Sequence, residues 1–235
     1  MKALLHKSNS NIRKSNKKIG FYYITDTTIT GMTHYEQIKS LFENNLNLKY
    51  IQYREKRKSI EEMKSDLEQI LELKKSYSTK TKLIINDYLE LAFEYADGVH
   101  LGKDDINLKE AIKLVENFGK KLNIDFEIGV SATSLEEVKF LQANFLDKIS
   151  YIGFGPIFHT KTKRDAAIPV GLNSLKIVMK ISKLPIVAIG GINSSNLKSV
   201  LDCQPNGIAA ISMVLKEKEI DFEIIRLIQE YYGLL

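Results

Sequence analysis

The amino-acid sequence predicts an α/β fold, a (β/α)8 TIM barrel, and three observations support this prediction. Short apolar runs alternate eight times with stretches whose apolar residues recur at helical spacing. The runs are apolar almost throughout, as parallel strands are when both of their faces are buried. A chain of 235 residues also has the length of one such barrel. An open doubly wound sheet is the alternative.

The first half of the chain contains four strand and helix pairs. Aromatic and β-branched residues mark the strands, and a short helical segment between the last two strands makes them parallel. In the longest helical segment, Met63, Leu67 and Ile70 form an apolar stripe opposite a charged face. We expect strands at residues 21–24, 50–54, 83–85 and 98–101, and helices at 35–42, 60–77, 88–95 and 108–118.

The second half of the chain repeats this alternation. Pro185 begins its most apolar run, and Gly190 and Gly191 end it. No linker-like stretch interrupts the chain after residue 20, so we expect a single barrel domain over residues 21–235. The expected strands are 126–130, 150–154, 185–189 and 207–211, and the expected helices are 135–145, 172–181, 194–201 and 222–231.

Charge and composition restrict the possible partners. Residues 1–20 hold six basic residues and no acidic one, so the net charge of +5 less this +6 leaves −1 for the rest. We interpret residues 1–20 as a flexible basic arm that aids solubility, with weak nucleic-acid attraction as the alternative. No apolar run approaches the roughly 18 residues of a membrane span. The single cysteine, Cys203, excludes an internal disulfide framework and indicates a cytoplasmic protein.

Acidic residues end two of the expected strands. Asp87 follows the strand at 83–85, and Asp104 and Asp105 follow the strand at 98–101. Because parallel strands point the same way, these carboxylates lie on one rim of the barrel. Two carboxylates without a cysteine nearby suit Mg²⁺ shared with a phosphate-bearing substrate. The alternative is that these acidic residues cap helices.

Basic residues at another strand end suggest a site for an anion. Gln52, Arg54 and Lys56 alternate along one strand, which places them on one face, expected to be the barrel interior. Burying two cations there costs several kcal/mol unless an anion such as pyrophosphate meets them. The alternative is a strand end at which both cations are solvated.

A second anion site is expected at the end of the last strands. Gly190 and Gly191 offer bare backbone N–H groups before a helix, and Ser212 follows the eighth strand. In the loop at 155–165, Lys163 is a candidate for a mobile charge that closes over a departing phosphate. The alternatives are a turn without a ligand and an ordinary lysine-rich surface loop.

The histidines carry less information. We interpret His100, within the fourth strand, as a hydrogen-bonded residue of the core or rim rather than as a base, and we place His34 in a loop.

Seven segments of the chain resemble, in order, the motifs of thiamine phosphate synthases. They are QYREK (52–56), IIND (84–87), ADGVHLGKDD (96–105), GVSAT (129–133), GFGPIFHTKTK (153–163), VAIGGI (187–192) and GIAAIS (207–212). The resemblance implies a (β/α)8 barrel, usually a homodimer, that joins hydroxymethylpyrimidine pyrophosphate to thiazole phosphate. It also implies Mg²⁺ dependence and a dissociative mechanism in which pyrophosphate leaves before the thiazole nitrogen attacks.

The resemblance also implies a role for individual residues. Asp87 and Asp105 would be the Mg²⁺ ligands, which favours Asp105 over Asp104. Arg54, Ser131 and Lys163 would be the catalytic residues. The substrate contacts would come from Gln52, Arg54, Lys56, Asn86, Ser131, Thr160, Thr162, Lys163, Gly191, Ile211 and Ser212.

Some positions depart from the family pattern. Thr133 stands where a histidine is frequent, Lys103 where glutamine is usual, and His159 where proline is frequent. A thiazole tautomerase of the same fold is the closest alternative, but Thr133 replaces the histidine such an enzyme would use. A non-catalytic protein that binds thiamine precursors, or a regulatory protein, is the other alternative. The intact set of acidic and basic residues disfavours it.

Overall fold

The computed structural model describes residues 17–46, 48–103, 105–122, 125–162 and 167–235. Most of the expected arm, together with Asp104 and Lys163, lies outside these residues. No described helix is long and apolar enough to cross a membrane.

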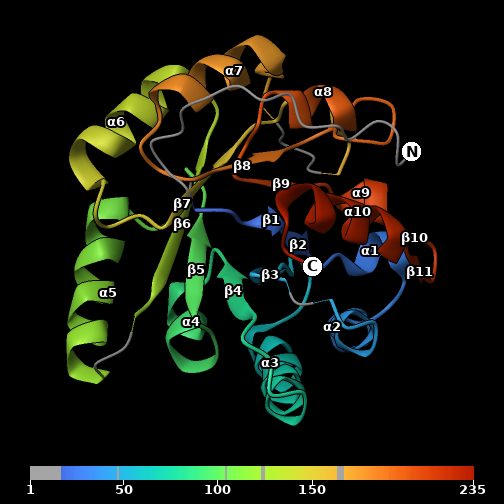
Figure 1. The fold of residues 1–235 in the computed structure, drawn as a ribbon. Helices are drawn as coiled ribbons and strands as arrows, with labels where there is room; N and C mark the ends of the chain where they lie inside the picture. The colour runs from blue at the N-terminus through green and yellow to red at the C-terminus, as the bar shows by residue number, and fades with distance from the viewer. Residues whose placement is uncertain (1–16, 47, 104, 123–124, 163–166) are drawn as a thin grey trace.

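Parallel strands form a closed ring, which confirms the predicted (β/α)8 barrel and excludes an open sheet (Figure 1). The strand order is β1-β9-β8-β7-β6-β5-β4-β3-β2, and β1 and β2 are consecutive segments separated by Tyr22. The nine segments therefore close an eight-stranded ring. They are β1 (Gly20–Phe21), β2 (Tyr23–Ile24), β3 (Tyr50–Tyr53), β4 (Lys82–Asn86), β5 (Gly98–Leu101), β6 (Glu127–Ala132), β7 (Tyr151–Phe154), β8 (Ile186–Ile189) and β9 (Gly207–Ala209).

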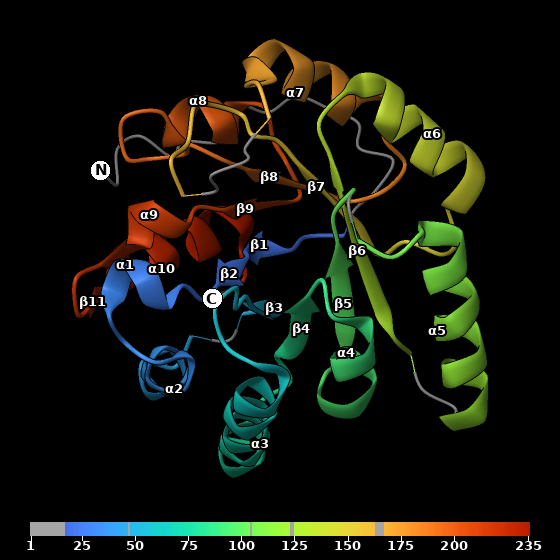
Figure 2. The same ribbon diagram turned by 180° about the vertical axis from the view of Figure 1, so that it is seen from behind.

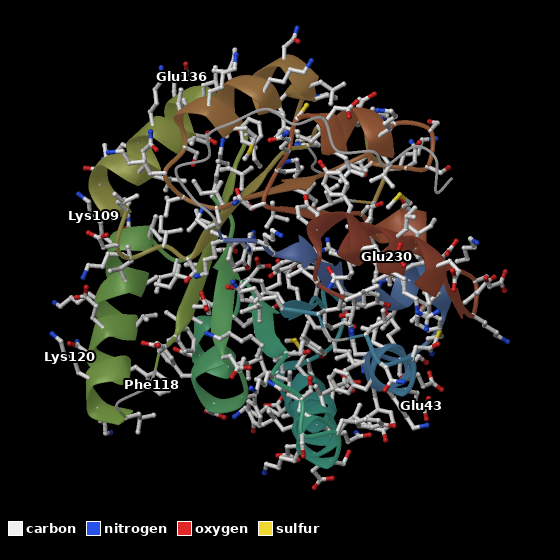
Figure 3. All side chains as sticks on the ribbon, viewed as in Figure 1. Glu43, Lys109, Phe118, Lys120, Glu136 and Glu230 are labelled. Carbon is white, nitrogen blue, oxygen red and sulfur yellow. The ribbon has the colours of Figure 1, made fainter. Side chains whose placement is uncertain are left out.

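Helices surround this ring (Figures 1 and 2). Charged side chains such as Lys109, Lys120 and Glu136 project from the outer helices (Figure 3), and the apolar faces pack on the strands. The helices are α1 (Thr27–Thr30), α2 (His34–Glu43), α3 (Ile60–Ser76), α4 (Leu89–Tyr95), α5 (Leu108–Leu122), α6 (Leu135–Phe145), α7 (Gly171–Ile181), α8 (Leu197–Asp202), α9 (Ile211–Val214) and α10 (Phe222–Tyr232).

The structure differs from the sequence-based expectation near the C-terminus. Ile211, expected in the last strand, begins the short helix α9, and a hairpin of β10 (Leu215–Lys216) and β11 (Glu219–Ile220) precedes α10. Helix α8 begins at Leu197 rather than at residue 194. The Asn193 side chain accepts a hydrogen bond from Ser195 N at 2.9 Å and holds a turn that delays the helix.

The barrel wall begins within the residues that the sequence assigned to the arm. Ile19 is fully buried, its N–H donates to Asn206 O at 2.7 Å, and Gly20 pairs with Gly207. Asn206 Nδ2 also donates to Lys17 O at 3.0 Å. Residues 17–20 are thus bonded to the barrel.

Three tyrosines fill the barrel interior. Tyr22, Tyr50 and Tyr151 are each at most 2% exposed, and their ring centroids lie 5.3 to 5.6 Å apart. Gly129 makes room for this cluster, because a Cβ there would lie 2.2 Å from Tyr151 Oη. The three rings fill the barrel interior up to a level short of the carboxyl ends of the strands. A cavity remains between the rings and those strand ends.

Helix α10 closes the ring where the first strand is interrupted. The Gln229 side chain, 1% exposed, accepts a hydrogen bond from the buried Phe21 N–H at 2.8 Å. The Gln229 side chain thereby provides the hydrogen-bond acceptor for the Phe21 N–H, which lies next to the interruption of the strand at Tyr22.

We predict that Gln229→Ala lowers the free energy of unfolding by about 2 kcal/mol, because the buried Phe21 N–H loses a partner. Urea denaturation followed by circular dichroism measures the change. The control is Gln69→Ala, since Gln69 is an exposed helical glutamine that donates to Ser65 O; it should change the value by less than about 0.5 kcal/mol. Equal losses of stability in the two variants would contradict the role of Gln229 as the partner of the Phe21 N–H.

Candidate active site

A cavity of about 290 Å³ opens at the carboxyl ends of the barrel strands. This is the end at which (β/α)8 barrels carry their active sites. Eleven of the predicted site residues line it: Gln52, Arg54, Lys56, Asn86, Asp87, Ser131, Thr160, Thr162, Gly191, Ile211 and Ser212. Asp105 does not line the cavity, but its carboxyl forms a hydrogen bond with that of Asp87, which does. Lys163 lies outside the described residues.

The cationic side of the cavity comes from the end of β3. The strand ends at Tyr53, so Gln52 alone of the three alternating residues belongs to the strand, and its side chain is buried. Arg54 and Lys56 nevertheless line the cavity. Arg54 Nη1 lies 3.4 Å from Asp26 Oδ2, and the Lys56 ammonium pairs with the Asp87 carboxylate.

The acidic side of the cavity comes from the ends of β4 and β5. Asp87 has a φ of 70°, the left-handed region that aspartate tolerates better than most residues, and its N–H donates to His100 O at 2.9 Å. Asp105 Oδ2 accepts the Gly102 N–H at 2.6 Å. Burial, and next a hydrogen bond with the Asp87 carboxyl, raise the pKa of Asp105. The two acidic groups therefore repel each other when both are ionised.

This acidic pair fits a divalent cation. The Lys56 ammonium already stands against Asp87, where a positive charge is favoured. Among the described residues, no group of three or more His, Cys, Asp or Glu side chains could hold a metal. Mg²⁺ commonly takes one or two carboxylates and completes its shell with water and substrate phosphate, so two carboxylates suffice.

A chain of hydrogen bonds crosses the floor of the cavity. Gln52 Nε2 donates to Tyr22 Oη at 3.1 Å, the Tyr22 and Tyr151 hydroxyls lie 2.6 Å apart, and Tyr151 Oη lies 3.2 Å from His100 Nδ1. His100 Nε2 then lies 3.0 Å from Ser131 Oγ. Burial raises the pKa of both phenols, so they are protonated. His100 is thus a hydrogen-bonded residue at the base of the site, as the sequence indicated.

The chain of hydrogen bonds has a consistent direction from Gln52 to Ser131. Because Gln52 donates first, Tyr22 can donate to Tyr151 and Tyr151 to His100 Nδ1. In this direction His100 Nε2 donates to Ser131 Oγ and leaves the Ser131 hydroxyl hydrogen for the cavity, whereas the other His100 tautomer reverses the bonds from Ser131 to Tyr22.

Two glycines form the turn after β8. Gly190 and Gly191 have φ values of 96° and 66°. A Cβ on Gly191 would lie 2.4 Å from His159 O, and one on Gly190 would lie 2.4 Å from the Pro156 Cβ. The turn therefore packs its backbone directly against the loop that carries Thr160 and Thr162.

Three residues near the site were not identified as functional from the sequence. Asp26 is buried beside Arg54, and His34 and Glu55 form a buried pair with His34 Nε2 3.0 Å from Glu55 Oε2. The placement of His34 in a loop was wrong, since His34 is the first residue of α2. The capping box of Thr33 and Glu36 in the sequence could have located that helix start.

Two of the departures from the family pattern meet at the rim of the cavity. Lys103 Nζ donates to Thr133 Oγ1 at 2.9 Å and pairs with Glu137, which also accepts the Thr133 N–H at 2.6 Å. Lys103 and Thr133 both line the cavity. The two side chains are therefore in direct contact with each other.

These features define the class of barrel proteins that keep a polar cavity at the carboxyl ends of their strands. Residues 21–214 match the family model described as thiamine monophosphate synthase, so the chain belongs to this family.

Curated relatives and a solved structure agree with this membership. The thiamine-phosphate synthase of Methanosarcina barkeri is 36% identical over 214 residues, which cover 90% of each chain. That of Chloroflexus aurantiacus is 38% identical over 202 residues, covering 85% of this chain and 86% of the relative. The structure of thiamine phosphate pyrophosphorylase from Pyrococcus furiosus superposes with a TM-score of 0.76 at 29% identity, covering 92% and 98% of the two chains.

We predict that Gly191→Ala destabilises the fold more than Gly31→Ala does. Gly31 has nearly the same φ, 68°, but no atom lies within 4 Å of the place that a Cβ would take there. Gly31→Ala should therefore cost about 1 kcal/mol for the left-handed backbone, and Gly191→Ala about 2 to 3 kcal/mol because of the added clash. Urea denaturation measures the free energy of unfolding of both variants. Equal losses would show that the loop at 156–159 moves aside for the added Cβ at no cost.

Proposed function

We propose that the chain is a transferase that couples hydroxymethylpyrimidine pyrophosphate to thiazole phosphate, giving thiamine phosphate and pyrophosphate. Family membership and the thiamine-phosphate synthases among its relatives support this activity. The observation that carries it is the meeting of Arg54, Lys56 and Asp87 on one rim of the cavity. Opposite charges there suit a metal-bound pyrophosphate.

Within this proposal, the residues divide between the two substrates. Asp87 and Asp105 hold Mg²⁺, and the pyrimidine pyrophosphate contacts are Gln52, Arg54, Lys56, Asn86 and Lys163. Thr160 and Thr162 contact the thiazole, and its phosphate lies on backbone groups of Gly191, Ile211 and Ser212. The cavity lined by the described members of both sets supports this division.

The reaction needs a stabilised leaving group more than it needs an acid or a base. The bond between the pyrimidine methylene carbon and pyrophosphate oxygen breaks, and pyrophosphate departs with the electron pair. The thiazole nitrogen then forms a bond to that carbon. Mg²⁺, when bound, neutralises charge on the leaving pyrophosphate. Arg54 and Lys56 supply positive charge that is already oriented before the bond breaks. Lys163 adds a mobile charge that closes over the departing phosphate. The Ser131 hydroxyl contacts the reacting region.

The tautomerase alternative has less support. Thr133 carries no group that exchanges a proton near neutral pH, and its Oγ1 is bonded to Lys103 and lies 3.2 Å from Glu137 Oε2. A tautomerase also releases no pyrophosphate, whereas the acidic and basic groups of the cavity suit a metal-bound pyrophosphate.

Mass spectrometry of the purified chain with both substrates tests the proposal. We expect thiamine phosphate in the presence of Mg²⁺ and none after EDTA treatment. Absence of coupled product with Mg²⁺ present would refute the proposal, and an isomerised thiazole without coupling would instead favour the tautomerase.

Asp87→Asn tests the proposed role of Asp87 as a Mg²⁺ ligand, because asparagine tolerates the left-handed backbone at this position but lacks the charge. We expect kcat/KM to fall by about 100-fold or more at an unchanged circular dichroism spectrum. The control is Asp97→Asn, which removes a carboxylate that pairs with Lys74 and accepts the N–H of Leu83 near the start of β4. Its activity should stay within about twofold of the original value.

We also propose that the chain acts as a cytoplasmic homodimer with residues 1–16 as a dispensable basic arm. The resemblance to the family supports the dimer, and the single Cys203 supports a reducing compartment.

Deletion of residues 2–16 should leave turnover and the dimer intact, because the bonds of Lys17 and Ile19 to Asn206 remain. Light scattering and the coupling assay measure the two properties. A loss of either property at native circular dichroism would assign the arm a role in assembly or catalysis.

A further inference from the structure

A buried polar assembly of Thr25, His34 and Glu55 lies next to the cationic side of the cavity. His34 and Thr25 are 0% exposed and Glu55 is 6% exposed, and none of the three is among the cavity-lining residues. Burying a carboxylate is unfavourable unless hydrogen bonds or charges compensate for the lost water. The partners of Glu55 therefore indicate what this assembly does.

The hydrogen bonds fix the protonation of His34. Thr25 Oγ1 lies 2.7 Å from His34 Nδ1, and Glu55 Oε2 lies 3.0 Å from His34 Nε2. Burial lowers the pKa of His34, so the ring is neutral near neutral pH. A neutral ring facing a carboxylate at Nε2 must carry its proton there. The Thr25 hydroxyl hydrogen then goes to Nδ1 at 2.7 Å in preference to Gln52 O, its other acceptor, which lies 3.3 Å from Thr25 Oγ1.

The second carboxylate oxygen of Glu55 holds the backbone that follows β3. Glu55 Oε1 accepts the N–H groups of Lys56 and Arg57 at 2.6 and 2.7 Å. Burial acts to raise the pKa of Glu55, but the His34 hydrogen bond and these backbone hydrogen bonds outweigh it and leave the pKa lowered. Glu55 is thus a carboxylate that binds its own turn.

Thr25 holds the preceding residue in the same way. Its Oγ1 accepts the Arg54 N–H at 3.2 Å, and its N–H donates to Gln52 O at 3.0 Å. The backbone of residues 54 to 57 is therefore bonded at three N–H groups to one buried assembly, which His34 joins together.

We propose that His34 and Glu55 are positioning residues that hold Arg54 and Lys56 in the geometry that binds pyrophosphate. This inference rests on the proposed function only for the identity of the substrate. Without the assembly, two like-charged side chains on a loose turn would separate, and binding an anion would have to reorder both. With it, the cost of ordering the turn is met during folding.

Isothermal titration with inorganic pyrophosphate and Mg²⁺ tests the proposal without turnover. We expect Glu55→Ala to weaken binding by about tenfold or more, because the turn loses three hydrogen bonds. The matched control is Glu127→Ala, which removes a similarly buried carboxylate, 8% exposed, paired with Lys82 at 2.6 Å at the start of β6. It should destabilise the fold similarly but change pyrophosphate binding by less than about twofold.

Glu55→Gln supplies a rescue that a merely stabilising role would not require. Its amide oxygen can still accept both backbone N–H groups, and its NH₂ can donate to His34 Nε2 if the ring moves its proton to Nδ1. We expect pyrophosphate binding within about threefold of the original value. The ¹⁵N NMR spectrum should show the Nε2–H tautomer of His34 in the original chain and the Nδ1–H tautomer in Glu55→Gln.

The outcomes separate this inference from the proposed function. Pyrophosphate binding that is unchanged in folded Glu55→Ala, or weakened equally in Glu127→Ala, would overturn the positioning role. A doubly protonated His34 at neutral pH, or no binding of Mg²⁺ and pyrophosphate by the original chain, would overturn it as well. Loss of binding confined to Glu55→Ala in a chain that makes no thiamine phosphate would support the positioning role while refuting the synthase activity.

Discussion

The hydrogen bond between the Tyr22 and Tyr151 hydroxyls, 2.6 Å long inside the barrel, is the interaction on which the site depends. A buried phenol is costly without a partner, and here the two phenols serve each other and extend the chain of hydrogen bonds to Gln52 and Ser131. Tyr50 differs, because its buried hydroxyl takes no part in this chain of hydrogen bonds. The side chains that fill the barrel interior thus also form the floor of the cavity. A change in their packing would therefore change the geometry of the site.

The charged rim obeys a related constraint. Gln52, Arg54 and Lys56 line the cavity even though β3 ends at Tyr53, whereas the residue between the two cations does not line it. Glu55 occupies that position and meets His34 at the start of α2. One short stretch therefore contributes cations to the cavity and a carboxylate to the layer behind it. The charge in the buried layer stabilises the conformation of the stretch that carries the cations.

The sequence predicted what depends on local pattern. Apolar periodicity located the alternating elements, and strand ends located Asp87 and Arg54, since both features repeat over a few residues. It did not predict contacts between distant segments, such as Gln229 with Phe21 N or His34 with Glu55. The turn at Asn193 and the helix at Ile211 were also missed, because a side-chain hydrogen bond holds the turn and a helix of four residues is too short to show apolar spacing. The pattern identified the two tyrosines at the floor only as strand residues, since their partners lie far apart in the chain.

The arrangement of charges also explains why no described residue of the cavity needs to act as a strong base. Asp87 has a left-handed backbone and pairs with Lys56, while Asp105 is held by the Gly102 N–H. The Lys56 ammonium offsets the charge of Asp87, whereas burial and the hydrogen bond with the Asp87 carboxyl raise the pKa of Asp105, so the two carboxyl groups do not ionise independently. Within the proposed function, Asp87 and Asp105 would hold a divalent cation, and the Lys56 ammonium would then pair with phosphate oxygens of the substrate. On that proposal, the ion pair between Lys56 and Asp87 is the arrangement before substrate binds, and the site would stabilise the charge of a leaving group rather than act by acid and base catalysis.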